Sequence, residues 1–355
     1  MTDLDLTTDA AALTVALCDI ESVSGAEVVL ADAVERALRS IPHLSVDRDG
    51  DTVVGRTQLG RDERVVIAGH LDTVPLGDNL PCRVEGGRIH GCGTTDMKSG
   101  VAVALRLAAH VREPNRDVTY VFYDNEEVEA EKNGLGRVSR NNPEWLAGDF
   151  AVLMEPTNAT VEGGCQGTLR ADVVLHGHRA HSARSWMGSN AVHAAGEVLA
   201  RLAAYQAAEV DIDGLVYREG LNAVGISGGV AGNIIPDECR ITVNYRFAPD
   251  KTEAEAADVV RRVLDGFEVE VSDSAPGAMP GLSHPAAAAF VKMVGREPQP
   301  KFGWTDIARF SALGVPAVNY GPGDPSVAHQ REEYCDIAPI LECEQQMFAW
   351  LSSAR

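Results

Sequence analysis

Histidine and acidic residues recur where predicted strands end in this sequence of 355 residues. The residues are His70, Asp72, Asp96, Glu126, Glu127, Glu155 and His329. Imidazole nitrogens and carboxylate oxygens are ligands of divalent metal ions, so a set of this kind could build a metal centre. Taken singly, each residue has a structural explanation, since Asp96 could cap a helix and Glu126–Glu127 could lie in a solvated turn.

Each of these residues follows an apolar segment or lies in the loop after one. The strand-like segments are residues 64–69, 118–123, 151–154 and 314–321, and Asp96 follows a glycine-rich stretch before a predicted helix at 99–111. In an open parallel sheet, ligands gather outside the carboxyl ends of the strands. We therefore expect the residues to converge, although they are far apart along the chain.

The ligand types indicate which metal to expect. Two imidazoles with several carboxylates suit zinc, or cobalt and manganese as substitutes, whereas copper and iron–sulfur sites use thiolates or thioethers. Two divalent cations would bring four positive charges against the three negative charges of Asp96, Glu127 and Glu155, and a bridging hydroxide would balance the site. Bound cations would thus offset the acids that are clustered in Asp124–Glu129.

The surrounding patterns predict two kinds of domain. Before residue 170, near-continuous apolar strands alternate with helices, and Ser24–Glu27 has capping-box spacing before an amphipathic helix at 28–38. These patterns predict a mainly parallel sheet covered on both faces. Residues 170–177 and 239–247 alternate like half-exposed strands, and amphipathic helices are predicted at 190–206 and 252–267. We predict a metal-binding catalytic domain of residues 1–170 and 285–355, with an α+β domain of residues 171–284 inserted into it.

The composition limits the partners and the location. The formal net charge of −21 opposes binding to nucleic acid or acidic membranes, which relies on basic patches. The sequence starts with acidic rather than basic residues, and no stretch approaches the roughly 18 apolar residues of a spanning helix, so we expect a cytoplasmic protein. Seven scattered cysteines without a C-x-x-C pair suggest neither a disulfide framework nor a thiolate zinc site.

Four motifs together resemble a known enzyme family. They are GHLDTVP (69–75), GCGTTDMKSG (91–100), NEEVE (125–129) and LMEPT (153–157), with the distal His329. They are similar to those of the co-catalytic zinc metallopeptidases and deacylases, which include aminoacylase and bacterial glutamate carboxypeptidase. The resemblance covers nearly the whole chain and implies an α/β, zinc-peptidase-like catalytic domain with an inserted α+β, ferredoxin-like lid and dimerisation domain.

The resemblance also implies roles for the residues at the strand ends. It implies two zinc ions per subunit, with His70 and Glu155 on one ion, Glu127 and His329 on the other, and Asp96 bridging both. Asp72 would orient the imidazole of His70, and Glu126 would be the general base of an amide hydrolysis. His181 matches the family's oxyanion-stabilising histidine, which usually reaches the other subunit, so a homodimer is implied. A histidine that only caps a turn is the alternative for His181.

The substrate is inferred from the same resemblance. Residues 133–138 and 302–334 are most similar to the actinobacterial desuccinylases of the family, which implies N-succinyl-L,L-diaminopimelate as a small-molecule substrate. Its carboxylates need cationic or amide donors, for which the candidates are Arg184, Asn233, Arg246, Trp304 and Thr305. Gln166–Thr168 departs from the Arg-Gly-Ser stretch that proteobacterial relatives carry, so we expect the recognition of substrate carboxylates to differ there.

Other functions fit parts of the sequence. An N-acyl-amino-acid deacylase of the acetylornithine type, or a dipeptidase, would keep the chemistry and change the acyl group. A non-catalytic binding protein on the same fold would not need Glu126 in addition to the ligands. Nucleotide binding through residues 91–100 is rejected, because Met97 stands where the Walker pattern requires glycine before Lys98. Lys98 is expected to face solvent or to pair with an acid.

Overall fold

A computed structural model describes residues 3–353, which divide into two compact units. Unit 1 comprises the chain up to Gly163, Gly281–Gln299 and the chain from Arg309 onward. Unit 2 comprises Gly164–Pro280 and Pro300–Ala308. Unit 2 thus begins and ends a few residues before the predicted insertion does. It also includes Pro300–Ala308, which the sequence analysis assigned to the catalytic domain.

Unit 1 is built on an eight-stranded sheet with the strand order β1-β2-β6-β3-β7-β18-β8-β17. The strands are β1 (Ser45–Asp49), β2 (Thr52–Arg56), β3 (Arg64–His70), β6 (Asp117–Tyr123), β7 (Phe150–Leu153), β8 (Glu162–Gly163), β17 (Gln299–Pro300) and β18 (Ala317–Asn319). The central strands β6, β3, β7 and β18 run parallel, and β1, β2 and β8 pair antiparallel toward the edges. The mainly parallel sheet is therefore confirmed. A second small sheet joins β4 (Arg83–Glu85), β5 (Arg88–His90) and β19 (Tyr334–Asp336).

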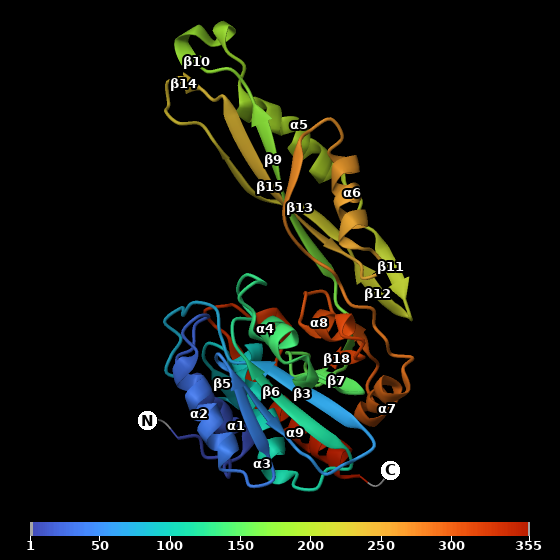
Figure 1. Cartoon of the computed structure of the whole chain (residues 1–355). Coiled ribbons are helices and arrows are strands. Elements are labelled where there is room, and N and C mark those ends of the chain that lie inside the picture. The colour runs from blue at the N-terminus through green and yellow to red at the C-terminus, as the bar shows by residue number, and fades with distance from the viewer. Residues whose placement is uncertain (1–2, 354–355) are drawn as a thin grey trace. The chain divides into compact units, whose positions relative to one another are not determined.

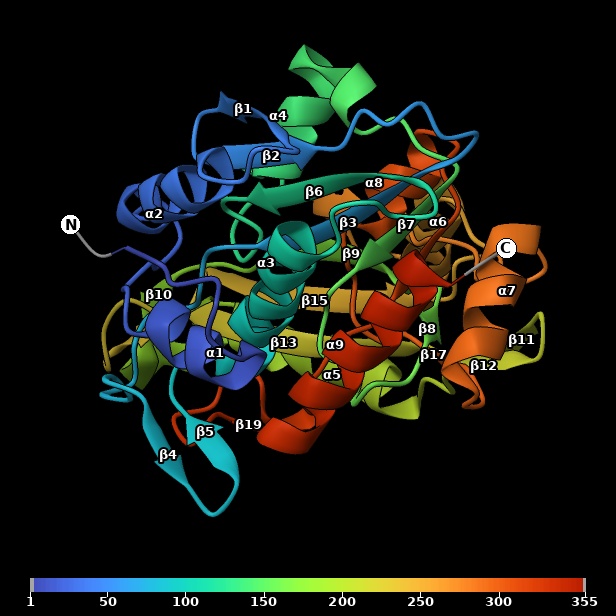
Figure 2. The ribbon, with the colours of Figure 1, turned by 90° about the horizontal axis from the view of Figure 1, so that it is seen from below.

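Helices cover both faces of the large sheet. They are α1 (Ala10–Cys18), α2 (Val28–Arg39), α3 (Ser99–His110), α4 (Gly134–Asn141), α7 (Pro285–Val294), α8 (Ile307–Ala312) and α9 (Ile337–Ser352), with short turns η1 (Thr94–Lys98), η2 (Pro143–Trp145) and η4 (Pro325–Val327). Figure 2 shows α1, α3 and α9 on one side of the sheet and α4 on the other. Val65 and Ile67 of β3 pack into the core with α1, α3 and α9. Val66 and Ala68 are also buried and face the opposite side, because side chains alternate along a strand.

Unit 2 is an α+β unit with one four-stranded antiparallel sheet of order β13-β15-β9-β16. Its main elements are β9 (Gly167–His176), α5 (Ala191–Ala204), β13 (Gly220–Gly228), β15 (Glu238–Phe247), α6 (Glu253–Val263) and β16 (Val269–Ala275). The chain order βαββαβ with this strand order is the ferredoxin-like arrangement. Leu169, Ala171 and Val173 pack against both helices, while the alternate residues of β9 face away from them. The smaller pairs are β10 (Ala180–His181) with β14 (Ile234–Ile235) and β11 (Glu209–Ile212) with β12 (Leu215–Arg218), and η3 spans Ser182–Met187.

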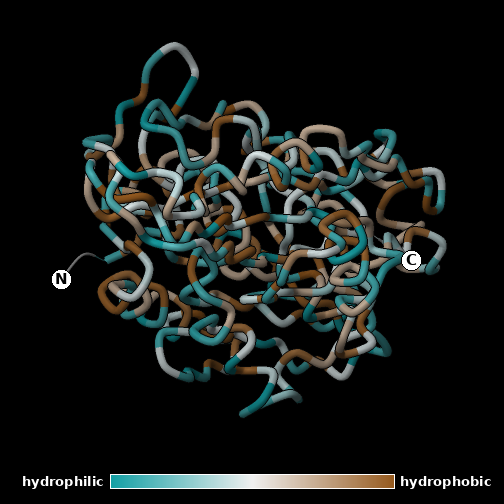
Figure 3. Tube along the Cα trace, turned by 90° about the horizontal axis from the view of Figure 1, so that it is seen from above, coloured by the Kyte–Doolittle hydropathy of each residue, from teal (hydrophilic) through white to brown (hydrophobic). Residues whose placement is uncertain are grey.

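Hydropathy changes repeatedly along the chain. Figure 3 shows hydrophobic and hydrophilic stretches alternating along the trace, with hydrophilic stretches in many of the loops. No helix within residues 3–353 is long and apolar enough to cross a membrane. All seven cysteines carry free thiols, and six of them are buried.

Asp124, directly after β6, has its own cationic partner. Its carboxylate accepts hydrogen bonds from Arg137 at 2.7 and 3.0 Å and from the Thr52 hydroxyl at 2.7 Å. Burial by itself would raise the pKa of Asp124, but Arg137 and Thr52 lower it below its ordinary value of 3.8. Glu129 is paired with Lys132 at 2.9 Å. The expectation that bound cations offset these two acids is therefore wrong, because arginine and lysine side chains already do so.

We expect Arg137→Met to lower the free energy of unfolding near pH 7 by about 2 kcal/mol, because it leaves a buried carboxylate without its cation. The folded-state pKa of Asp124 lies below its unfolded value. The stabilisation is therefore present above about pH 4 and is lost as the pH falls through the folded-state pKa. Urea unfolding between roughly pH 7 and pH 3 should show the difference from the wild type shrink as the pH falls.

Arg140→Met is the matched control, because Arg140 is an exposed arginine of the same helix. An equal loss of stability in both variants, or a loss in Arg137→Met that does not change with pH, would contradict the assignment of the Asp124–Arg137 pair.

Candidate active site

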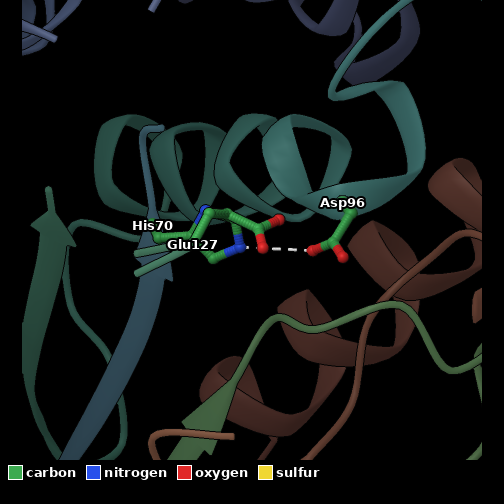
Figure 4. A group of neighbouring side chains, drawn as sticks. All are labelled: His70, Asp96 and Glu127. Atoms are coloured by element: carbon green, nitrogen blue, oxygen red, sulfur yellow. Dashed lines mark hydrogen bonds and ion pairs between the residues drawn. The ribbon is translucent and has the colours of Figure 1, made fainter. Parts of the chain in front are cut away.

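Predicted ligands from separate segments meet in unit 1. Ligand atoms of His70, Asp96 and Glu127 all lie within 4.8 Å of one another (Figure 4). Nε2 of His70 lies 3.2 Å from Asp96 Oδ1. Nε2 of His329 lies 3.3 Å from Asp96 Oδ2 and 2.8 Å from Glu127 Oε1. The carboxylate of Asp96 thus stands between two imidazoles, and the four side chains bring together nitrogen and oxygen atoms of the kinds that bind divalent metal ions.

The parallel strands bring these residues to one edge of the sheet. His70 is the last residue of β3, and Glu127 and Glu155 follow the strands on either side of it, β6 and β7. Ala68 pairs with Leu153, so His70 and Glu155 lie equally far beyond that pair. Glu155 is 5% exposed, and its backbone reaches the same edge as the cluster. That the side chain of Glu155 binds a metal ion remains a prediction.

Two glycines enclose the backbone that carries Glu155. A Cβ atom at Gly100, in the first turn of α3, would lie 2.1 Å from the carbonyl oxygen of Met154. A Cβ atom at Gly321, after β18, would lie 2.7 Å from the carbonyl oxygen of Glu155. Both distances are shorter than any van der Waals contact, so only glycine fits at these positions without a shift of the backbone.

Asp72 is a fully buried carboxylate that touches two ligand segments. It accepts the N–H groups of Glu126 and Glu127, both at 3.0 Å, and the hydroxyl of Ser24 at 2.7 Å. Nδ1 of His70 lies 3.0 Å from the carbonyl oxygen of Asp72 and 3.5 Å from its carboxylate. Because a carbonyl oxygen can only accept, the neutral ring carries its proton on Nδ1 and presents the lone pair of Nε2 to the cluster.

The loop before Glu127 is held through its backbone. Glu27 Oε1 accepts the N–H of Asn125 at 3.0 Å, next to the two bonds made by Asp72. Asn125 has a φ of 57°, a left-handed conformation that asparagine tolerates better than most residues. The capping box predicted at Ser24–Glu27 is wrong. Glu27 is the N-cap of α2 without a side-chain bond to the helix, and both side chains contact the active-site segments instead.

The cluster carries an excess of negative charge. Asp96 and Glu127 raise the pKa of His329 to about 10. Burial lowers the pKa of His70, but the carboxylates of Asp72 and Asp96 raise it well above its usual value. Burial raises the pKa of Asp96, but His329 and His70 lower it far below its usual value. The two histidine shifts report a field that favours positive charge at this point, and the same field favours a divalent cation; the Asp96 shift reports the attraction of its carboxylate to the two imidazoles.

The prediction for Lys98 is wrong, since this side chain is buried and forms no ion pair with an acid of the described residues 3–353. It is 1% exposed, and its Nζ donates to the carbonyl oxygens of Leu17 and Ile20 at 3.2 and 2.9 Å. The carbonyl groups at the end of α1 need donors, which Lys98 supplies. These bonds anchor the loop that carries Asp96.

The predicted residues of unit 2 form two groups, and the first surrounds β10. Nδ1 of His181 accepts the N–H of Ala183 at 3.0 Å, which leaves the proton on the exposed Nε2. This bond is the turn cap considered as the alternative role. Arg184 follows in η3, and the carbonyl oxygen of Asn233 accepts the N–H of Ser182 at 2.9 Å. His181, Arg184 and Asn233 are therefore neighbours.

The second group lies at the opposite end of the same sheet. Arg246 pairs with Thr168 near the start of β9, whereas β10 follows the end of β9, and Figure 1 shows β10 at one end of unit 2. Trp304, beside Thr305, donates its Nε1–H to the carbonyl oxygen of Pro276 at 3.1 Å, directly after β16. A strand as long as β9, of 10 residues, spans about 30 Å. The structure therefore does not bring the two groups together within unit 2.

Arg170 is a cation that the sequence analysis missed. It lies on the exposed face of β9, and together with burial it lowers the pKa of Arg246 on the neighbouring strand. Gln166 is buried, and its amide donates to the carbonyl oxygen of Arg218 at 2.6 Å. The amide nitrogen of Gln166 is therefore already engaged with the backbone. In the sequence, only the alternation of apolar and polar residues along its strand could have marked Arg170 as a side chain on the exposed face.

Comparisons with known proteins agree with this arrangement. Residues 66–352 match the family described as Peptidase family M20/M25/M40. The chain is 55% identical over 340 residues to a DapE protein of Mycobacterium tuberculosis, covering 95% of this chain and 96% of that protein. It is 49% identical over 360 residues to the succinyl-diaminopimelate desuccinylase of Corynebacterium glutamicum, covering 98% of each. A tripeptidase from Staphylococcus aureus shares the fold, with a TM-score of 0.80 at 20% identity over 98% of both chains. This chain belongs to peptidase family M20/M25/M40.

Proposed function

We propose that this chain hydrolyses the amide bond of N-succinyl-L,L-2,6-diaminopimelate to succinate and L,L-diaminopimelate, a step in the synthesis of lysine and peptidoglycan precursors. The observation that carries the proposal is the placement of Asp96 between two imidazoles, with Glu127 beside His329. A dinuclear amide hydrolase needs this shared carboxylate. The choice of substrate is supported by 49% identity, over 98% of each chain, to the desuccinylase of Corynebacterium glutamicum.

The side chains of the cluster fit two divalent metal ions. We assign His70 and Glu155 to one ion, Glu127 and His329 to the other, and Asp96 to both, because Asp96 faces both imidazoles. Zinc suits this set of nitrogen and oxygen ligands, and cobalt or manganese can replace it. When bound, such ions polarise the scissile carbonyl and offset the charge that develops on its oxygen.

We assign Glu126 the role of general base. Asp72 holds its backbone N–H at 3.0 Å, next to Glu127, and its side chain is partly exposed. Glu126 is adjacent to the proposed ligand Glu127 and is not among the three residues whose ligand atoms converge, so we assign it to proton transfer and not to metal binding. Glu126 takes a proton from the attacking water and passes it to the leaving amine. One water is consumed and one C–N bond is broken.

Glu126→Gln should lower kcat by at least about 100-fold, because an amide cannot take up the proton, and it should leave the metal content unchanged. Glu127→Gln should instead lower the metal content, because it removes a proposed ligand. Steady-state kinetics and elemental analysis of the same dialysed preparations measure both effects. Glu131→Gln, which changes an exposed acid of the same loop, is the control. Turnover that survives in Glu126→Gln would remove Glu126 from the proton transfer.

A substrate series tests the acyl group. Zinc-loaded protein should turn over N-succinyl-L,L-diaminopimelate with a kcat/KM roughly 100-fold or more above that for N-acetylornithine or simple dipeptides, because these lack a carboxylate that the site must bind. Loss of the signal in Glu126→Gln excludes a contaminating enzyme. Equal or better turnover of N-acetylornithine or a dipeptide would favour a deacylase or dipeptidase. Metal-loaded protein without any turnover would favour a binding protein.

The positions of the proposed substrate residues favour a homodimer. His181 and Arg246 lie near opposite ends of the unit 2 sheet, about 25–30 Å apart along the strands, which is too far for one small substrate. We therefore assign His181 of each chain to the site of its partner, where the exposed Nε2–H would stabilise the oxyanion. Strand β13 is an edge strand whose Val224 and Ile226 are 60% and 55% exposed, as expected of a surface that pairs with a second copy.

Mixed dimers test this sharing of residues. His181→Ala and Glu126→Gln should each be inactive alone. A dimer of one chain of each kind, isolated with two affinity tags, should recover about half of the wild-type rate, because one of its two sites is complete. A mixed dimer without activity would place His181 in the site of its own chain or outside the site.

The cytoplasmic location of the protein remains a prediction from the sequence.

A further inference from the structure

The loop that presents Asp96 is held by the carboxylate of Glu333. Oε1 of Glu333 accepts the N–H groups of Thr95 at 2.9 Å and Asp96 at 3.2 Å, and Oε2 accepts that of Gly93 at 3.1 Å. Glu333 is 2% exposed, and within residues 3–353 it forms no ion pair. Three converging N–H groups therefore supply the hydrogen bonds that a buried carboxylate needs.

Glu333 also links two segments that carry ligands. It lies four residues after His329 in the sequence, and its carbonyl oxygen accepts the N–H of Gly91 at 3.0 Å. The next residue, Tyr334, begins β19, which pairs with β5. The segment after β5 leads to Asp96. The side chain and the main chain at Glu333 therefore hold the segment of Asp96 against the segment of His329.

The role of Asp72 offers a direct comparison. Asp72 is a buried carboxylate that accepts the backbone N–H groups of Glu126 and Glu127. We infer that Glu333 is a positioning residue of the proposed metal centre, whose carboxylate fixes the backbone of Asp96 so that the Asp96 side chain faces both imidazoles. This inference rests on the proposed function and extends it by a second carboxylate that acts through the backbone.

The contact requires both oxygens of a carboxylate. Oε1 serves Thr95 and Asp96, and Oε2 serves Gly93. Glutamine has one acceptor oxygen, so its NH2 group would face at least one of these N–H donors. The loop must then move away from the side chain, and Asp96 moves with it. Glu333→Gln is therefore a disruptive change although it conserves shape.

Kinetics and metal spectroscopy of Glu333→Gln test the inference. We expect kcat to fall about 10- to 100-fold, which is the range typical when a hydrogen-bond partner that orients a metal ligand is removed. KM should stay within about 3-fold of the wild-type value. The visible absorption spectrum of the cobalt-substituted protein should change as well. Glu332→Gln, which changes an exposed neighbour by the same charge, should leave kcat, KM and the spectrum unchanged. Folded Glu333→Gln with a wild-type spectrum and kcat within about 2-fold would overturn the inference.

Amide hydrogen exchange tests the contact separately from the reaction. In the full-length wild-type protein, with and without zinc, the backbone amides of Thr95 and Asp96 should exchange slowly. In Glu333→Gln the same amides should exchange at least about 10-fold faster. Fast exchange in the wild type would overturn the inference. Slow exchange in a wild type that binds no metal and turns over no substrate would count against the proposed function instead. If Glu333→Gln does not fold, Glu333→Asp, which keeps both oxygens at a shorter reach, replaces it under the same expectations.

Discussion

Repulsion between carboxylates is the constraint that shapes the carboxyl edge of the large sheet. Strands β6, β3 and β7 all end there, and acids follow each of them. The chain offsets this charge in two ways. Arg137 pairs with Asp124, and backbone N–H groups surround Asp72 and Glu333. What remains is the negative field around Asp96, which raises the pKa of both neighbouring imidazoles and makes the site attractive to divalent cations.

The bonds from backbone N–H groups to buried carboxylates also fix the irregular loops. Neither the loop of Glu127 nor that of Asp96 belongs to a regular α-helix or strand, so no ladder of hydrogen bonds holds it. Asn125 and His329 have φ values of 57° and 61°, a conformation that costs of the order of 1 kcal/mol and persists where surrounding contacts impose it. The site is thus preorganised by contacts that reach its backbone, in addition to those that reach its side chains.

Unit 2 divides the proposed substrate contacts between the two ends of one sheet. Arg170 and Arg246 lie near the start of β9, and His181 lies beyond its end. A ten-residue strand separates cations suited to a carboxylate from a donor suited to an oxyanion. In the proposed homodimer this separation becomes useful, because each chain can contribute one end of its sheet to each site.

The residue pattern alone was sufficient for the mainly parallel sheet of unit 1 and for an inserted α+β unit, because apolar periodicity reports which faces are buried. The ferredoxin-like form of that unit was implied by the family resemblance. It also identified His70, Asp96, Glu127 and His329, because parallel strands that end at one edge must present the residues that follow them there. The tertiary structure decided the contacts that depend on which distant backbone groups lie opposite a side chain. Ser24 and Glu27 were predicted to cap a helix, Lys98 was predicted to face solvent or pair with an acid, and nothing in the sequence marked Glu333, since local spacing carries no record of a hydrogen bond to a loop far away in sequence.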